Sequence, residues 1–175
     1  MQDPLFNYIM EDRQELKYYK KIMKFELKYS VLYGNAYTPS SEIEGVICFS
    51  RNKNYGYDFF KSIRAGVLSL WTLGKKAGER FRKYDEFADE KHKEIIQKPH
   101  IYIELLAVAP QNQGSGYGGK LLSAVIKEAK KQELPCYLET HLEKNASFYE
   151  RFGFERADQS LVPGTEITQY SMLYK

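Results

Sequence analysis

The sequence predicts one domain of the α/β (α+β) class, in which a mixed, mostly antiparallel sheet carries helices on both faces. Short apolar runs of strand length alternate with longer segments whose apolar residues recur every three to four positions. A glycine-rich turn after Val108 then joins one of these strands directly to a helix, so the strand after that helix is expected to run parallel to it. A chain of 175 residues fits a single domain, residues 1–175, and can bury about two-thirds of its unfolded surface.

The amino-acid composition limits which kinds of partner the protein is expected to bind. The 26 basic and 23 acidic residues are interspersed, and a formal net charge of +3 does not indicate a nucleic-acid footprint. Cys48 and Cys136 lie in apolar, strand-like runs, so we expect buried, reduced thiols rather than a disulfide framework. The first residues lack the pattern of a secretory signal, and no span approaches the roughly twenty apolar residues of a membrane helix. We expect a cytoplasmic monomer or homodimer with no nucleic-acid or membrane partner.

The first 99 residues predict a helical entry, a hairpin and two further helices. Asp3 followed by Pro4 is typical of a helix start, and helical spacing of apolar residues continues to Leu27. Residues 31–37 and 43–49, joined by 38–41, predict an antiparallel hairpin. The loop at 51–54 precedes a nearly continuous apolar helix over 58–73, and a highly charged helix follows it. The apolar stripe of that charged helix comprises Ala77, Phe81, Tyr84, Ala88 and Ile95.

From His100 onward the pattern becomes strand, turn and helix. Residues 101–108 form the predicted strand, and residues 136–140 form the parallel strand after the helix. A helix over 145–151 and a closing hairpin of 152–157 with 165–173, turning at Pro163-Gly164, complete the chain. The buried stripe of the helix after the glycine turn comprises Leu121, Leu122, Val125, Ile126 and Ala129.

The glycine turn is expected to bind a phosphate, because glycine lets the backbone approach a ligand and a helix N-terminus attracts anions. Residues 114–119 match the dinucleotide pattern G-x-G-x-x-G, with Glu139 as the acidic residue of the next strand, but too little chain follows for the remaining strands of that fold. Residues 114–120 match the phosphate loop G-x-x-x-x-G-K, but Leu121 stands where a hydroxyl must reach magnesium. Both alternatives are disfavoured.

A third pattern accounts for more of the sequence. The series Val108-x-Pro110-x-x-Gln113-Gly114-x-Gly116-x-Gly118 resembles the acetyl-coenzyme A signature of the GNAT superfamily of N-acetyltransferases. A later segment of the family is similar to residues 135–140 and 145–154, which contain Asn-x-x-Phe-Tyr and then Gly-Phe. Within the family, Leu-Glu-Thr at 138–140 is similar to the puromycin N-acetyltransferase branch. The resemblance covers residues 100–175 well and is faint before them. It implies the GNAT acyl-CoA N-acyltransferase fold, with two splayed parallel central strands holding the pantetheine arm.

The resemblance also implies which residues bind acetyl-CoA. The glycine turn would hold the pyrophosphate through backbone N–H groups, with Gly116 and Gly118 required for steric reasons. Asn145 would contact pantetheine or act as a helix N-cap, Phe148 would pack on the arm, and Arg151 would meet a phosphate or solvent. The cofactor-binding set is Leu106, Ala107, Val108, Gln113, Gly114, Ser115, Gly116, Tyr117, Gly118, Gly119, Lys120, Asn145, Phe148, Tyr149 and Arg151.

Acetyl transfer to an amine needs a base, an oxyanion donor and an acid for the leaving thiolate. The family position makes Tyr149 the acid, and the N–H of Val108 or a neighbour the donor. Glu104 is a candidate base, expected on the same strand face as Val108 by the two-residue period, and Glu139 competes with it. His141 is a weaker candidate, and no histidine pairing of metal-ligand spacing is present, so no metal is expected.

The expected activity is transfer of the acetyl group of acetyl-CoA to a primary amine of a small molecule by direct attack in a ternary complex. A non-catalytic acetyl-CoA-binding module and a protein or peptide N-acetyltransferase remain alternatives. The acceptor is expected to be selected by the N-terminal segments, up to about residue 96, where the resemblance is faint.

Overall fold

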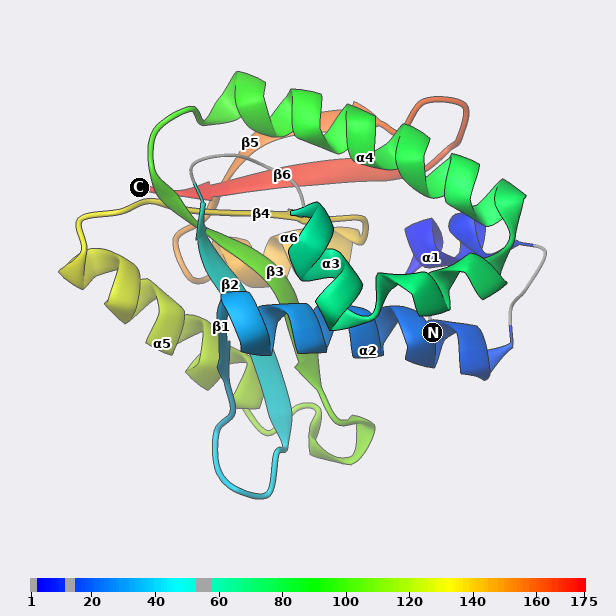
Figure 1. Ribbon diagram of the computed structural model, residues 1–175. Coiled ribbons are helices and arrows are strands. Elements are labelled where there is room, and N and C mark those ends of the chain that lie inside the picture. The colour runs from blue at the N-terminus through cyan, green and yellow to red at the C-terminus, as the bar shows by residue number, and fades with distance from the viewer. Residues whose placement is uncertain (1–2, 12–14, 53–57) are drawn as a thin grey trace.

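The computed structural model describes residues 3–11, 15–52 and 58–175, which form a mixed sheet between helical layers (Figure 1). Within these residues the sheet has six strands in the order β1-β2-β3-β4-β6-β5, and every neighbouring pair is antiparallel except β3 with β4. The strands are β1 (Asn35–Tyr37), β2 (Gly45–Asn52), β3 (His100–Val108), β4 (Cys136–Thr140), β5 (Glu155–Leu161) and β6 (Thr168–Tyr174). The helices are α1 (Pro4–Ile9), α2 (Leu16–Tyr33), α3 (Phe59–Ala65), α4 (Lys75–Ile95), α5 (Tyr117–Lys131) and α6 (Glu143–Glu150), with 3-10 segments η1 (Val67–Leu73) and η2 (Pro110–Asn112).

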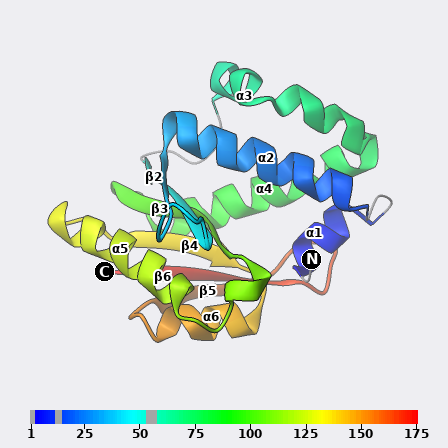
Figure 2. The same cartoon turned by 90° about the horizontal axis from the view of Figure 1, so that it is seen from below.

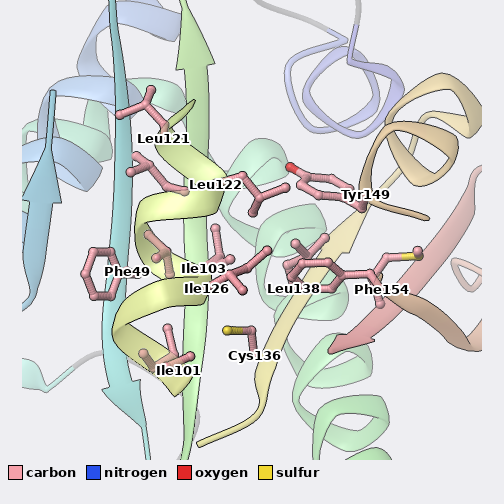
Figure 3. Packing of buried hydrophobic residues seen from close by; sticks show 14 of the residues in the cluster. Phe49, Ile101, Ile103, Leu121, Leu122, Ile126, Cys136, Leu138, Tyr149 and Phe154 are labelled. Atoms are coloured by element: carbon pink, nitrogen blue, oxygen red, sulfur yellow. The ribbon is translucent and has the colours of Figure 1, made fainter. Parts of the chain in front are cut away.

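The two faces of the sheet are covered by different parts of the chain. Helices α5 and α6 lie on one face, and α2, α3 and α4 lie on the other (Figure 2). On the first face the apolar stripe of α5, including the fully buried Leu122 and Val125, packs on Ile101 and Ile103 of β3 (Figure 3). On the second face Leu5 and Ile9 of α1 pack with Ile22 of α2 in a separate cluster. The predicted mixed sheet with helices on both faces is confirmed.

The first half of the predicted first hairpin strand is helix. Helix α2 continues through Tyr33, and only Asn35–Tyr37 joins the sheet. Val31 is 66% exposed, so the apolar run at 31–33 lies on the outer surface of a helix instead of in a strand. Gly34 ends the helix where a Cβ would lie 3.0 Å from the carbonyl oxygen of Phe49, so packing against β2 sets this boundary. The partner strand occupies Gly45–Asn52 rather than 43–49.

The apolar helix predicted over 58–73 is broken. Gly66 has φ +103°, a left-handed conformation that ends α3 and begins η1. Phe60 and Trp71 are 78% and 82% exposed, so the apolar character of this segment does not reflect burial. The charged helix α4 is confirmed, with Ala77 and Ala88 buried on its inner side.

The C-terminal elements agree best with the sequence. Helix α5 and strand β4 occupy the expected residues, and the turn between the last two strands contains Pro163-Gly164. Helix α6 begins at Glu143 with Leu142 as N-cap, so Asn145 lies within the first turn and the N-cap alternative for it is wrong. The closing strands are shifted to Glu155–Leu161 and Thr168–Tyr174. No helix within the described ranges is both long and apolar enough to span a bilayer.

Candidate functional site

The two parallel strands separate soon after they meet. They pair at Ile101 with Cys136 and at Tyr102 with Tyr137, and the pairing goes no further along the described strands. The N–H of Ala109 donates to the Glu44 carbonyl at 2.8 Å, on the β2 side. Because successive strand N–H groups alternate in direction, those of Leu106 and Val108 point toward the open side between β3 and β4. The backbone of Ala107 instead faces β2, so its predicted cofactor contact has no polar group on the open side.

The glycine turn leads from the end of β3 into α5. Gly114 and Gly116 have φ of +80° and +82°, and Gly116 is the N-cap of α5. Among the described residues, no acceptor is found for the backbone N–H groups of 114–119. A Cβ at Gly114 or Gly116 would meet no atom within 4 Å, so the space beside the turn is open. Unpaired N–H groups at a helix N-terminus fit an anionic ligand.

The side chains around the turn have distinct surroundings. Gln113 donates from Nε2 to the Val108 carbonyl at 3.2 Å, which ties the turn to the end of β3. The Lys120 ammonium lies 5.1 Å from the Tyr117 ring centre, and the Arg151 guanidinium 5.7 Å from the ring centre of Phe148. Ser115 is exposed. These two cations place positive charge at the predicted phosphate site.

The other two glycines of the motif, Gly118 and Gly119, differ in how much space a Cβ would have. A Cβ at Gly118 would lie 3.6 Å from the Phe148 ring and 3.7 Å from Val108, both ordinary contacts, so the protein itself leaves room there. A Cβ at Gly119 would lie 2.8 Å from the Phe152 ring, which is too close. Gly119 is therefore required by the packing of α5 on Phe152, which follows the end of α6. Gly118, Val108 and Phe148 therefore lie close together.

Tyr149 lies on α6 with its ring in the main core. The side chain is 9% exposed and packs beside Phe154, with its oxygen directed toward Leu122 (Figure 3). Burial raises the pKa of the phenol to about 12, so it is protonated at neutral pH. Asn145, on the same helix, donates to the Thr140 hydroxyl at 3.2 Å and links α6 to the end of β4.

Glu104 does not share a face with Val108, and that prediction is wrong. The register of β2 with β3 shifts between Cys48 and Phe49, so Glu104 is passed over in the pairing as the extra residue of a β-bulge. The carboxylate accepts hydrogen bonds from Ser30 of α2 and Ser50 of β2, each at 2.7 Å. It therefore faces α2, whereas Val108 lies near Gly118 on the α5 side.

Glu139 is the second carboxylate on the α2 and α4 face. Glu139 lies two residues beyond the last position at which β4 pairs with β3, and Glu104 lies two residues beyond that position on β3. The Tyr102 hydroxyl donates to Oε2 at 2.8 Å, and Oε1 is buried. Burial raises the pKa of this carboxyl to about 7, although hydrogen bonds from the phenols of Tyr102 and Tyr137 oppose the rise. Glu139 can therefore exchange a proton near neutral pH.

The histidines occupy structural surroundings. His141 is half-buried, its ring centre lies 5.3 Å from that of Tyr84, and desolvation lowers its pKa. His92 and His100 face each other with their Nε2 atoms 2.7 Å apart. Over 3–11, 15–52 and 58–175, no group of three or more His, Cys, Asp or Glu residues is arranged to hold a metal ion.

Sequence reasoning did not identify the residues that hold the two carboxylates. Tyr102 precedes Glu104 by two residues, so the strand period could have placed it on the carboxylate face. Ser30 and Ser50 carry no such signal, because their contact with Glu104 depends on how α2 crosses the sheet.

Comparisons with a family model and with known sequences both identify acetyltransferases as similar to this chain. Residues 74–156 match the acetyltransferase (GNAT) domain family. An uncharacterised N-acetyltransferase of Schizosaccharomyces pombe is 26% identical over 163 residues, which are 87% of this chain, and the match spans 64% of that protein's length.

Solved structures share the fold. Arylalkylamine N-acetyltransferase 2 from Aedes aegypti superposes with a TM-score of 0.61 at 15% identity, covering 99% of this chain and 86% of that one. An agmatine N-acetyltransferase gives 0.60 at 14% identity, covering 94% and 85%. The open strand pair and the glycine turn both lie within residues 74–156, the segment that matches the acetyltransferase (GNAT) domain family.

Proposed function

We propose that the protein transfers the acetyl group of acetyl-CoA to a primary amine of a small molecule by direct attack in a ternary complex. The observation that carries the proposal is the opening between β3 and β4. The glycine turn lies at the end of β3 beside α5, and Glu104 and Glu139 line the opposite face of the sheet. Two substrates that approach from opposite faces can meet in such an opening.

The residues around the turn fit acetyl-CoA, which supplies the acetyl thioester. The free N–H groups of 114–119 would hold the pyrophosphate, with Lys120 and Arg151 adding positive charge. The N–H groups of Leu106 and Val108 face the opening; that of Leu106 would bind the pantetheine arm, with Phe148 packing on it.

The chain supplies groups for each proton transfer. Glu139, with a pKa near 7, accepts a proton from the amine, and Glu104 remains the second candidate base. The N–H of Val108 donates to the acetyl carbonyl as negative charge develops on its oxygen. Tyr149 is protonated and donates to the departing sulfur. One proton leaves the amine and one reaches the thiolate, so the transfer is balanced.

The test measures cofactor binding and turnover separately. Acetyl-CoA should raise the melting temperature, and coenzyme A should be released in the presence of a primary amine with initial rates typical of a ternary complex. Tyr149→Phe should keep the thermal shift and lower kcat by roughly 10² to 10⁴. Tyr174→Phe, which changes another aromatic packed on Phe154, is the matched control and should retain normal turnover.

The alternatives predict different results. A non-catalytic acetyl-CoA-binding module would show the thermal shift without amine-dependent release of coenzyme A. A peptide N-acetyltransferase would acetylate peptide amines in preference to small ones. The finer resemblance to the puromycin N-acetyltransferase branch rests on residues 138–140 and 148–154 and would be supported by acetylation of puromycin.

A further inference from the structure

A large apolar cavity lies in the helical layer on the carboxylate face of the sheet. It has a volume of about 570 Å³ and lies between α1, α2, α3, η1 and α4. Its walls include Phe6, Ile22, Phe25, Leu70, Trp71 and Phe81. The volume matches that of pockets for small organic ligands, which run from about 300 to 1,000 Å³.

The cavity adjoins the candidate site through two helices. Glu26 lines it from α2, one helical turn before Ser30, whose hydroxyl binds Glu104. Phe81 lines it from α4, one turn before Asp85, whose charge acts on Glu139. Figure 2 shows α2 and α4 on the same face of the sheet. The cavity is therefore on the side from which an acceptor would reach the opening between β3 and β4.

The charged side chains that line the cavity favour a ligand with its cation at the end toward the sheet. Glu26 and Lys75 are the charged side chains among the described residues that line it. The Lys75 side chain is 91% exposed and pairs with Glu79 at 3.8 Å, so its charge is directed to solvent. Toward the sheet Glu26, Glu104, Glu139 and Asp85 are all acidic. A second charge on the ligand would be desolvated by apolar walls, which is unfavourable.

We propose, on the basis of the proposed function, that this cavity is the acceptor site and selects primary amines with a single charge and a bulky apolar body. The body fills the space between α1, α2, α3, η1 and α4, and the amine lies toward Glu26 and the sheet carboxylates. Di- and polyamines are poor acceptors, because no second acidic residue lines the described apolar walls. Each methylene that the cavity buries should raise affinity about fourfold, until the space is full.

Gly78 offers a clean way to fill the cavity. It lines the cavity from α4, and a Cβ built on it meets no atom within 4 Å. The side chain of Gly78→Leu should therefore extend into the cavity from an unobstructed Cβ, and the substitution replaces a glycine within a helix by a better helix former. Lys83→Leu adds the same side chain to an exposed position of α4 outside the cavity and serves as the matched control.

The experiment measures binding as well as turnover. Calorimetry on the protein saturated with coenzyme A would compare a series from ethylamine to hexylamine and phenethylamine with agmatine and spermidine. Affinity should rise along the apolar series, and agmatine and spermidine should bind at least tenfold more weakly than phenethylamine. Gly78→Leu should weaken phenethylamine binding at least tenfold and leave ethylamine nearly unchanged, whereas Lys83→Leu should change neither. Glu26→Gln should weaken every amine.

Contrary results would be clear. Tighter binding of spermidine than of phenethylamine, or unchanged phenethylamine affinity in Gly78→Leu, overturns the acceptor class. Acetylation of small polar amines alongside those results would leave the acetyltransferase function intact. Strong phenethylamine binding that Gly78→Leu abolishes, with no coenzyme A release from any amine, would support the cavity as an amine site and overturn the proposed catalysis.

Discussion

The chemistry of Glu139 depends on two opposing effects on one side chain. Burial disfavours the charged carboxylate, and the hydrogen bond from the Tyr102 hydroxyl favours it, with a resulting pKa of about 7. The sequence alone identified the Glu139 carboxylate as a candidate general base. Its environment comes from a tyrosine on the neighbouring strand.

Replacing Tyr102 by phenylalanine tests this balance. Loss of the hydrogen bond should raise the pKa of Glu139, because the donor stabilises the charged form, and the acidic limb of the kcat/KM profile should move upward by about one pH unit. Coenzyme A release measured from pH 5 to 9 gives the profile. Glu139→Gln should remove the limb, and Glu104→Gln should keep it. If Glu104→Gln removes the limb instead, Glu104 is the base and Tyr102 has no part in its titration.

At the scale of elements, two glycines at the turn before α5 have different effects: one leaves the backbone accessible and the other allows close packing. Gly116 adopts a left-handed conformation beside open space, where a ligand can approach the backbone. Gly119 instead lets α5 approach Phe152. The motif therefore joins a ligand requirement to a packing requirement within four residues.

Gly116→Val should abolish the thermal stabilisation by acetyl-CoA, since a branched side chain would occupy the space for the pyrophosphate. The variant also carries backbone strain, so it needs a control with equal strain. Gly164→Val provides one, because Gly164 has φ +75° and open space in the β5–β6 turn, far along the chain from the glycine turn. Equal acetyl-CoA shifts in the Gly116 and Gly164 variants would contradict the anion site.

Gly119→Ala should destabilise the fold by about 1 to 3 kcal/mol, because the added methyl would lie 2.8 Å from the Phe152 ring. Urea unfolding measures the change. Phe152→Leu should recover part of the loss in the double variant, as expected for two residues in direct contact. Additive effects of the two substitutions would show that the close approach is relieved elsewhere.

At the scale of the whole molecule, two titratable groups with shifted pKa values act on stability with opposite sign. The pKa of His92 is lowered from 6.5 to about 4 by burial and by His100, so its contribution is complete above pH 6.5 and is lost as pH falls through 4. The pKa of Glu139 is raised from 4.5 to about 7, so its contribution is complete below pH 4.5 and is lost as pH rises through 7. Between about pH 4.5 and 6.5 the two groups change the unfolding free energy with pH in opposite directions, so their effects offset each other.

Single substitutions should reveal each slope in the unfolding free energy. With Glu139→Gln, stability should rise with pH from about 4 to 6.5, by up to about 1.4 kcal/mol per pH unit. With His92→Gln, which keeps an N–H donor toward His100, stability should fall from about pH 4.5 to 7. Urea unfolding across this range measures both. Identical pH dependence in both variants would mean that other groups control acid stability.

The C-terminal half was predictable because its signals are local. The glycine turn, the stripe of α5 and the strand at 136–140 each depend on the residues that form them, and all agree with the structure. The likeness of residues 108–118 and 135–154 to one family therefore indicated, without coordinates, the same family whose model matches residues 74–156. The N-terminal half was less predictable, because apolar runs there are exposed on helices that pack through other residues.

The sequence by itself determined the class of fold, the glycine turn proposed to bind a phosphate, and the identities of Tyr149, Glu104 and Glu139 as candidates. Tertiary structure decided their surroundings. The bulge that turns Glu104 toward α2 arises from the register between two strands, and the acidity of Glu139 arises from burial and from Tyr102. The cavity proposed as the acceptor site is formed by five helical segments between residues 4 and 95. Such features depend on contacts between distant residues, which local periodicity does not encode.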